Sequence, residues 1–235
     1  MILLTTPTSF AVAIDGPAGV GKSTTARRVA ETLGMTYIDT GAMYRAIALY
    51  NVRKGVNPKD ENAVNATLPD IDVKLSQKQV LLNGEDVSTA IRTQAISDAT
   101  SQIAPYAAVR RKLDIIQKQQ ASTGQVIMDG RDIGSNVLPW AQVKIYLDAD
   151  VDTRAARRAA ELAAKGQPAN IGQIREEVAT RDQRDKNREH GPLIVAHDAT
   201  VIDTSTMTKD EVANSIIAHI NTARRKQCSI GSQEG

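Results

Sequence analysis

Residues 16–23 have the spacing of a phosphate-binding loop. The segment reads GPAGVGKS, which matches the pattern G-x-x-x-x-G-K-[ST], and it directly follows the apolar run Phe10–Ile14. In such loops the glycines let backbone N–H groups surround a phosphate, and the following helix directs its positive end toward that anion. Lys22 would reach the β- and γ-phosphates of a nucleoside triphosphate, and the Ser23 hydroxyl would ligate Mg²⁺. A glycine-rich turn that matches by chance is the alternative, but it explains neither the strand before the motif nor the helical pattern after it.

A second candidate site is the segment DTGAMYR, residues 39–45. By themselves, Thr40 could simply cap a helix and Arg45 could be a solvated helix charge. Their position after a predicted strand favours a functional role, because ligands of such sheets bind beyond the carboxyl ends of the strands. A hydroxyl and an arginine at that edge suit a second phosphate group.

A third candidate site is MDGRDIG, residues 128–134, which also follows an apolar strand. An acidic residue at the end of a strand commonly supports the Mg²⁺ of a phosphate-loop protein, so we predict that role for Asp129, in the second shell of the metal. Arg131 and Asp132 could form a local ion pair or could both face a ligand. The sequence leaves these two alternatives open.

Basic residues recur between Thr153 and Arg188. One group is Arg154, Arg157 and Arg158, and after a break at Gly166–Pro168 the segment RDQRDKNR fills residues 181–188. Helical spacing places Arg181, Asp185 and Arg188 on one face. An exposed, salt-bridged helix is the alternative, and it is the better interpretation for Arg184 and Lys186. Two arginines around one aspartate suit phosphates and a sugar hydroxyl, and a helix, a break and a second helix suit a lid over a triphosphate.

The candidate residues need a scaffold that brings strand ends together, and the sequence predicts one. Short β-branched runs alternate with helical patterns, which is typical of a parallel sheet covered by helices on both faces. The five predicted strands are Phe10–Asp15, Met35–Asp39, Val126–Asp129, Val143–Leu147 and Val201–Asp203. The predicted helices are Ser23–Leu33, Tyr44–Lys54, Ala107–Gln120, Thr153–Lys165, Ile171–Lys186 and Lys209–Lys226. Four aspartates stand at or just past strand ends, namely Asp15, Asp39, Asp129 and Asp148.

One region interrupts this alternation. Residues 70–76 and 79–85 read as a hairpin or meander with alternating faces, which predicts a small antiparallel insert between the second and third strands. The insert and a short lid belong to a single domain of 235 residues, because no linker or repeat divides the chain. We expect the segment after Arg225 to be frayed.

Composition limits the class of protein. Lys and Arg total 29 against 27 Asp and Glu, so a net charge of +2 gives no reason to expect a nucleic-acid or membrane partner. Cys228 is the one cysteine and allows no internal disulfide, which fits a reducing compartment. The N-terminal residues lack the features of a signal peptide, and no run of 18 apolar residues occurs. A cytoplasmic protein is expected.

Taken together, these motifs resemble those of bacterial cytidylate kinases, a branch of the P-loop nucleoside monophosphate kinases. The resemblance extends over residues 10–222. The stretches that carry it are IDGPAGVGKST at 14–24, DTGAMYRA at 39–46, IRTQ at 91–94, TSQ at 100–102, MDGRDIG at 128–134, VKIYLDA at 143–149 and RDQRDKNR at 181–188. The departures are small: threonine stands at position 40 where many members have serine, and Ser23 replaces a glycine that some members use.

The resemblance implies transfer of the γ-phosphoryl group of ATP to CMP, and also to dCMP, with Mg²⁺ as the cofactor. We expect a monomer, although the sequence itself does not give the quaternary state. ATP would be bound by Gly16, Pro17, Ala18, Gly19, Val20, Gly21, Lys22, Ser23 and Thr24, with Arg154, Arg157 and Arg158 in the lid. CMP would be bound by Thr40, Arg45, Ser101, Arg110, Arg131, Asp132, Arg181, Asp185 and Arg188, of which Ser101, Arg110 and Asp132 would recognise cytosine. The residues implied to assist transfer are Lys22, Arg131, Arg181 and Arg188. The monophosphate-binding insert would span about residues 40–105, and the lid about residues 153–188.

Two other classes of protein share part of this pattern. A related kinase for AMP, UMP, dTMP or shikimate would share the loop and lid but should lack the GRD stretch together with Ser101 and Arg110. A GTPase switch would need an N-K-x-D guanine-binding motif and a D-x-x-G after the loop, and the sequence contains neither.

Overall fold

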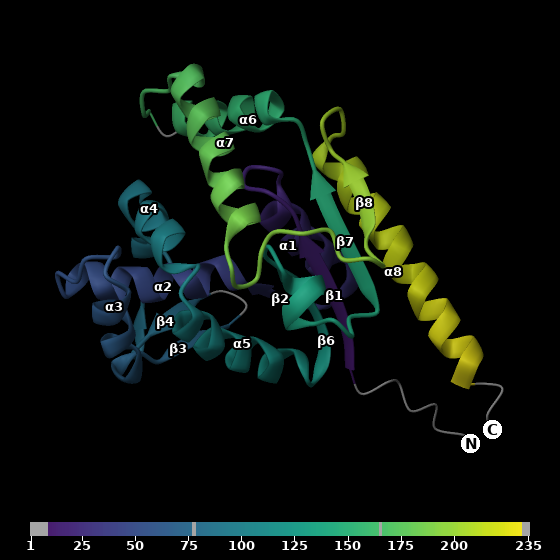
Figure 1. Ribbon diagram of the computed structural model, residues 1–235. Coiled ribbons are helices and arrows are strands. Elements are labelled where there is room, and N and C mark those ends of the chain that lie inside the picture. The colour runs from purple at the N-terminus through teal and green to yellow at the C-terminus, as the bar shows by residue number, and fades with distance from the viewer. Residues whose placement is uncertain (1–8, 77–78, 165, 232–235) are drawn as a thin grey trace.

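A five-stranded parallel sheet forms the centre of the computed structural model, which describes residues 9–76, 79–164 and 166–231 (Figure 1). Its strands are β1 (Ser9–Asp15), β2 (Thr36–Asp39), β6 (Gly124–Asp129), β7 (Val143–Asp148) and β8 (Thr200–Asp203). They lie in the order β2-β6-β1-β7-β8, and each neighbouring pair is parallel. The five predicted strands and the parallel sheet are therefore confirmed, with the ends of the strands moved by one or two residues.

The central strand β1 shows why this sequence forms a doubly covered sheet. Residues 10–14 are all apolar, and none is more than 2% exposed. Phe10, Val12 and Ile14 pack with α1 (Lys22–Leu33) and α8 (Lys209–Gly231) on one face. Ala11 and Ala13 face the opposite side. Strands that are buried on both faces require such continuous apolar runs, so the sequence of β1 specifies its central position.

The insert follows β2 and has a core of its own. It contains α2 (Thr40–Arg53), α3 (Glu61–Thr67), α4 (Gln94–Ile103) and α5 (Ala107–Ala121) around a three-stranded antiparallel sheet. The strands of that sheet are β3 (Val73–Leu75), β4 (Val80–Leu82) and β5 (Glu85–Asp86). These elements gather on the left side of Figure 1, away from α8. The predicted antiparallel insert is confirmed, while residues 77–78 of its first turn lie outside the described residues.

Several helix boundaries differ from the sequence prediction. Helix α2 begins at Thr40 rather than Tyr44, because the Asp39 carboxylate accepts a hydrogen bond from the Ala42 N–H (2.9 Å) and caps the helix. Helices α3 and α4 were not predicted. Helix α3 has only seven residues, and α4 packs Ile96, Ala99 and Ile103 into the core of the insert, so tertiary packing stabilises these helices more than local propensity does.

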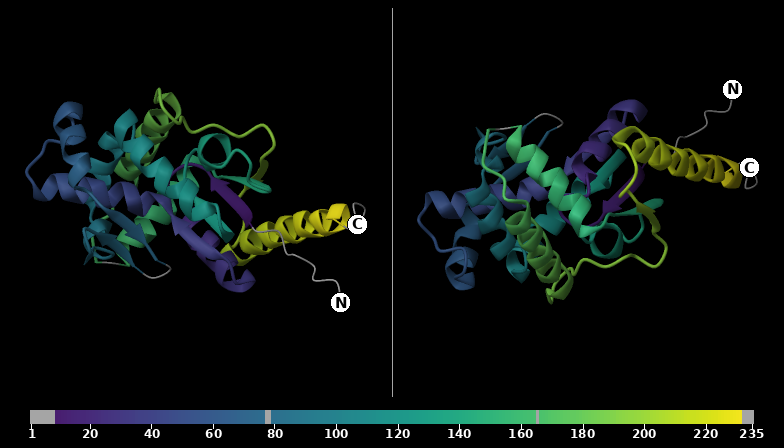
Figure 2. Two further views of the ribbon diagram at one scale, coloured as in Figure 1. Left: turned by 90° about the horizontal axis from the view of Figure 1, so that it is seen from below. Right: turned by 90° about the horizontal axis from the view of Figure 1, so that it is seen from above.

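The C-terminal segment also differs from the prediction. The chain after Arg225 was expected to be frayed, yet α8 continues to Gly231 and extends beyond the sheet in both views of Figure 2. Residues 232–235 of that segment lie outside the described residues. Among the described helices, none is long and apolar enough to cross a membrane.

Two further helices lie at the carboxyl ends of the strands. Helices α6 (Val151–Ala163) and α7 (Ile171–Asn187) are packed together at the top of Figure 1. A small apolar cluster of Ala155, Ile174 and Val178 joins them. The predicted helix, break and helix are therefore present.

Candidate active site

The phosphate loop lies between β1 and α1 and has an unusual backbone. Gly16, Gly19 and Gly21 all have positive φ, at 145°, 78° and 96°. At Gly16 a Cβ would lie 2.1 Å from the carbonyl oxygen of Leu147, so no side chain fits there. Helix α1 starts immediately afterwards at Lys22, and its first N–H groups have no partner within the helix. The loop therefore presents backbone donors and the positive end of a helix to one place.

Lys22 is buried beneath this loop. Its Nζ donates hydrogen bonds to the carbonyl oxygens of Gly16 (2.7 Å) and Pro17 (2.6 Å). Burial and the nearby charge of Arg131 lower the pKa of Lys22, and the surrounding carboxylates oppose this effect. The ammonium group is therefore held against the loop, where phosphate oxygens can replace the two carbonyl contacts.

Asp129 ends β6 and is held by two hydroxyl groups. Ser23 Oγ donates to its Oδ2 (2.8 Å), and the Tyr37 hydroxyl donates to its Oδ1 (2.8 Å). Burial and the charge of Asp39 raise the pKa of the Asp129 carboxyl. A hydroxyl and a carboxylate beside a phosphate loop are the oxygen donors that Mg²⁺ prefers, so these residues fit that cation.

The end of β2 brings Thr40 and Arg45 to the same side of the sheet. Thr40 Oγ1 donates to the backbone carbonyl of Asp129 (2.7 Å), which ties α2 to the end of β6. Burial lowers the pKa of Arg45, while Asp39 opposes that shift. Arg92 Nη2 also contacts Asp39 Oδ2, at 2.9 Å.

Arg131 and Asp132 do not pair with each other. Arg131 Nε donates to Asp185 Oδ2 (2.7 Å), a residue of α7 that is 54 positions later in the chain. Asp132 Oδ2 accepts from Arg110 of α5 and from Asn136 Nδ2 (3.1 Å). The local ion pair that the sequence left open is therefore absent, and each residue connects two distant elements.

The face of α7 that was singled out in the sequence points into this network. Arg188 lies 3.6 Å from Asp132 and 3.8 Å from Asp185, measured between nitrogen and oxygen. Burial and the charge of Arg131 lower the pKa of Arg181 to about 10. Within the described part of the chain, the buried Nε of Arg181 has no hydrogen-bond partner. Because buried donors are normally satisfied, Arg181 is set up to receive an acceptor from a ligand.

The three arginines of α6 point in different directions. Arg154 is buried and contacts Asp182 (2.6 Å) and the Ala18 carbonyl of the phosphate loop (3.2 Å). Arg158 donates to Gln94 of α4 (2.9 Å), across the space between α6 and the insert. Arg157 instead donates to the hydroxyl and to the backbone carbonyl of Thr204, which follows β8. The structure therefore does not bring Arg157 to the other candidate residues.

One large cleft joins these groups. It has a volume of about 1170 Å³ and lies between the phosphate loop, the insert and α7. The predicted residues that line it are Ala18, Gly19, Gly21, Lys22, Ser23, Thr24, Thr40, Arg45, Ser101, Arg110, Asp129, Arg131, Asp132, Arg158, Arg181, Asp185 and Arg188. Gly16, Pro17 and Val20 belong to the same loop without lining the cleft. The cleft therefore brings the lysine of the phosphate loop and the arginines of the insert, the central turn and α7 to one place.

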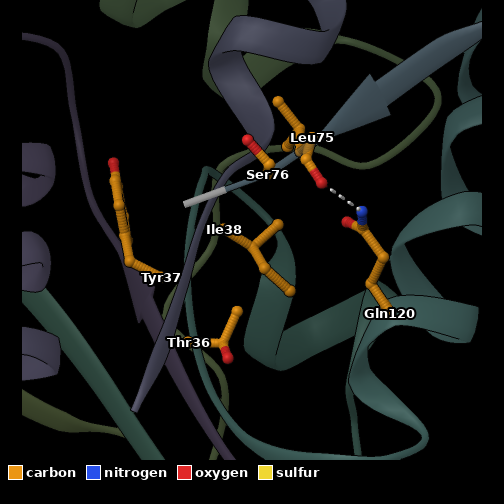
Figure 3. Close-up of a pocket in the computed structure, with 6 residues that line it drawn as sticks. All are labelled: Thr36, Tyr37, Ile38, Leu75, Ser76 and Gln120. Atoms are coloured by element: carbon orange, nitrogen blue, oxygen red, sulfur yellow. Dashed lines mark hydrogen bonds between the residues drawn. The ribbon is translucent and has the colours of Figure 1, made fainter. Parts of the chain in front are cut away.

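A second, smaller pocket lies at the outer edge of the sheet (Figure 3). It has a volume of about 120 Å³ and is lined by Thr36, Tyr37, Ile38, Leu75, Ser76 and Gln120. The Gln120 amide contacts the Leu75 carbonyl at 3.5 Å, which joins α5 to β3. The residues described around this pocket are apolar or uncharged, and residues 77–78, which follow Ser76, lie outside the described part of the chain.

Three residues of the site were not assigned a role from the sequence. Tyr37 and Arg92 hold Asp129 and Asp39 through the contacts described above. Asp15 ends β1, and its two oxygens accept hydrogen bonds from the N–H groups of Ile133 (2.8 Å) and Gly134 (2.7 Å). The position of Asp15 at a strand end was a signal in the sequence, but its partners are more than a hundred residues away.

Comparison with known proteins places these features in a family. The model of the family described as Cytidylate kinase matches residues 12–222. The cytidylate kinase of Pelotomaculum thermopropionicum is 46% identical over 220 residues, which cover 92% of this chain and 97% of that protein. The cytidylate kinase of Geobacillus kaustophilus is 45% identical over 216 residues, covering 90% and 96%.

A solved structure supports the fold alone. A gluconokinase from Sinorhizobium meliloti 1021 aligns with a TM-score of 0.50 and covers 94% of this chain and 97% of that chain. Its sequence identity is 10%, so the likeness concerns the arrangement of the sheet and helices.

The buried charge of Asp15 predicts a distinctive pH dependence of stability. Burial raises the pKa of Asp15 from 3.8 to about 6. Between about pH 4 and pH 6 the folded state therefore holds a proton that the unfolded state has released, so this group's contribution to stability falls as the pH rises. Relative to Asp15→Asn, the wild type should lose roughly 2 kcal/mol of unfolding free energy between pH 4.5 and pH 7.

Urea unfolding of both proteins at the two pH values measures this difference. Asp203→Asn is the control with the opposite sign, because hydrogen bonds from Ser205 lower the pKa of Asp203. Its contribution should be lost as the pH falls. If the free energies of unfolding of wild type and Asp15→Asn differ by the same amount at both pH values, the pKa of Asp15 is not raised in the folded protein.

Proposed function

Because this chain belongs to the cytidylate kinase family, we propose that it transfers the γ-phosphoryl group of ATP to CMP, giving CDP and ADP, and that it accepts dCMP as well. The observation that carries this proposal is the single cleft with a phosphate loop on one side and the Arg110–Asp132 pair on the other. A donor triphosphate and an acceptor nucleotide can approach each other between these two groups. The single cysteine supports a cytoplasmic enzyme, and a monomer is part of the proposal.

On the ATP side, residues 16–24 bind the phosphates through backbone donors and Lys22. Arg158 lines the same cleft, and Arg154 braces the loop at Ala18. Among the three lid arginines, we expect Arg157 to contribute least to ATP binding, because its guanidinium group donates to Thr204. Residues 153–188 serve as the lid in this proposal, which is supported by the contact of Arg158 with Gln94, because it connects α6 to the insert across the cleft.

On the acceptor side, about residues 40–105 bind the monophosphate together with α5 and α7. Thr40, Arg45 and Arg131 receive the phosphoryl group, while Arg181, Asp185 and Arg188 meet the phosphates and the ribose. Ser101, Arg110 and Asp132 contact the base. The support for these roles is that all nine side chains line one cleft.

Mg²⁺ bound with ATP belongs to the proposed reaction. Ser23 would hold it directly and Asp129 would act through Ser23, since the two side chains are joined at 2.8 Å. Such a cation would neutralise part of the charge of the phosphate groups.

The protein's own contribution is positioning and charge stabilisation. The phosphate oxygen of CMP is ionised at neutral pH, so transfer needs no general base. Lys22, Arg131, Arg181 and Arg188 are buried or half-buried at the place where the two polyanions meet. Such charges act strongly on the transferred phosphoryl group because they are already oriented and little water screens them.

Offering nucleoside monophosphates separately tests the proposed function. ADP formation from ATP should be fastest with CMP and dCMP and much slower with UMP and AMP, measured by a coupled assay with the purified full chain. Faster transfer to AMP, dTMP or shikimate would assign the chain to another phosphate-loop kinase. ATP hydrolysis without any acceptor dependence would contradict a kinase.

Lys22→Ala should remove most of the turnover and leave the fold intact. The lysine charge is needed most as charge develops on the transferred group, and loss of one such donor commonly lowers kcat by about 10²–10³. The KM for CMP should change little. Lys59→Ala, an exposed position in the insert, is the control and should behave as wild type. Near-normal turnover in folded Lys22→Ala would show that the phosphate loop is wrongly assigned.

Asp132→Asn should reduce discrimination between CMP and UMP. A carboxylate accepts a hydrogen bond from the exocyclic amine of cytosine but meets a lone pair on uracil, a difference of roughly 1–3 kcal/mol. An amide can present either a donor or an acceptor to the base. We therefore expect kcat/KM for CMP to fall about ten- to a hundredfold, and the CMP-to-UMP ratio of kcat/KM to become smaller.

Arg45→Ala provides the matched comparison for Asp132→Asn. Because it removes a contact to the phosphate that CMP and UMP share, it should weaken both substrates about equally. The measurement is kcat/KM for both nucleotides with each variant. If Asp132→Asn leaves the CMP-to-UMP ratio unchanged, Asp132 does not read the base.

A further inference from the structure

A single carboxylate connects the start of the phosphate loop to the turn that carries Arg131 and Asp132. Asp15 is 5% exposed and directly precedes Gly16. Its Oδ1 accepts from the Ile133 N–H at 2.8 Å, and its Oδ2 accepts from the Gly134 N–H at 2.7 Å. Both oxygens are therefore used, each by a different backbone donor.

The turn needs acceptors at this position. Residues 133–137 form a π-helical turn, in which the N–H groups of Asn136 and Val137 bond back to the Asp132 carbonyl at 2.9 and 3.1 Å. The first N–H groups of a helical turn have no partner inside it, and those of Ile133 and Gly134 are buried. Leaving a buried N–H without an acceptor is costly, so Asp15 fixes the start of the turn.

The position of the Asp132 carboxylate depends on this turn. Its side chain meets Arg110 and Asn136, but its backbone lies immediately before the two residues that Asp15 holds. A second link, from the Gly130 N–H to the Ile14 carbonyl at 3.0 Å, fixes the other end of the same segment. The segment 130–134 is thus held at both ends by the last two residues of β1.

The chemistry of the position favours a carboxylate. An amide has one acceptor oxygen and would direct N–H hydrogens at the other donor. A serine hydroxyl is shorter and cannot reach both N–H groups. Burial makes the charge of Asp15 unfavourable and raises its pKa to about 6, so a neutral residue would be expected here if packing alone mattered.

We infer that Asp15 is a positioning residue for base selection, which holds the turn so that Asp132 reaches the acceptor base; this inference rests on the proposed function. Asp15 lies behind the turn and acts through it. Its loss should therefore impair recognition of the base more than binding of ATP.

Two variants test the inference. Asp15→Asn has the same length as aspartate but keeps only one acceptor oxygen, and Asp15→Ser has a shorter side chain. Both variants remove a buried charge, which favours folding at neutral pH. Asp148→Asn is the matched control, because Asp148 ends the neighbouring strand β7 but is exposed, and its carboxylate accepts from the adjacent Ala149 N–H (3.0 Å). Each purified protein is compared by its melting temperature and by kcat and KM for CMP, UMP and ATP.

The expected result is a graded loss of selectivity. The CMP-to-UMP ratio of kcat/KM should fall about tenfold in Asp15→Asn and further in Asp15→Ser, mainly through a higher KM for CMP. The KM for ATP should stay within about threefold, and Asp148→Asn should match the wild type. A merely structural role would lower the amount of active enzyme for both nucleotides equally and leave the ratio unchanged.

The outcomes separate this inference from the proposed function. If the wild type transfers phosphate to CMP but both variants keep its CMP-to-UMP ratio, the positioning role is overturned and the proposed function stands. If the wild type shows no transfer to CMP, the proposed function itself fails.

Discussion

Charges that leave water need partners, and this requirement organises the cleft. Arg131 is paired with Asp185, Arg110 with Asp132, and Arg154 with Asp182. The first two pairs join α7 and α5 to the central turn, and the third joins α6 to α7, so together they fix these elements relative to one another. Removing one partner would leave an uncompensated buried charge, which costs several kcal/mol in typical proteins.

The pairing is incomplete in a way that suits anionic ligands. Among the described residues, Arg181 Nε and Arg188 Nη2 are buried without hydrogen-bond partners. Burial lowers the pKa of Lys22 and of Arg181, which shows that their charges are poorly solvated in the folded chain. Two polyanionic nucleotides would supply the missing acceptors, so binding would relieve an electrostatic cost that the free protein carries.

The parallel sheet brings these groups together. In the register of β1, β6 and β2, Ile14 and Asp39 both lie opposite Asp129. Because the strands run in the same direction, their carboxyl ends meet at one edge, and the residues that follow them share one crevice. The phosphate loop, Thr40 and the turn at Arg131 thus converge although they are far apart in the chain.

Local sequence determined much of this protein. The glycines and Lys22 of the loop specify their own conformation, and the continuous apolar runs specify buried parallel strands, since both depend on near neighbours. The five strands, the antiparallel insert and the paired helices of residues 151–187 were predicted on this basis. So was the set of charged residues at the strand ends.

Only the tertiary structure decided how those charges pair. The sequence could not show that Arg131 contacts Asp185 rather than Asp132, that Arg157 turns to Thr204, or that Asp15 holds a turn more than a hundred residues away. Helices α3 and α4 were missed for a related reason, because packing within the insert stabilises them more than their own propensity does. A charged side chain takes the partner that folding places nearest to it, and this choice is set by the sheet order and helix packing rather than by neighbours in the chain.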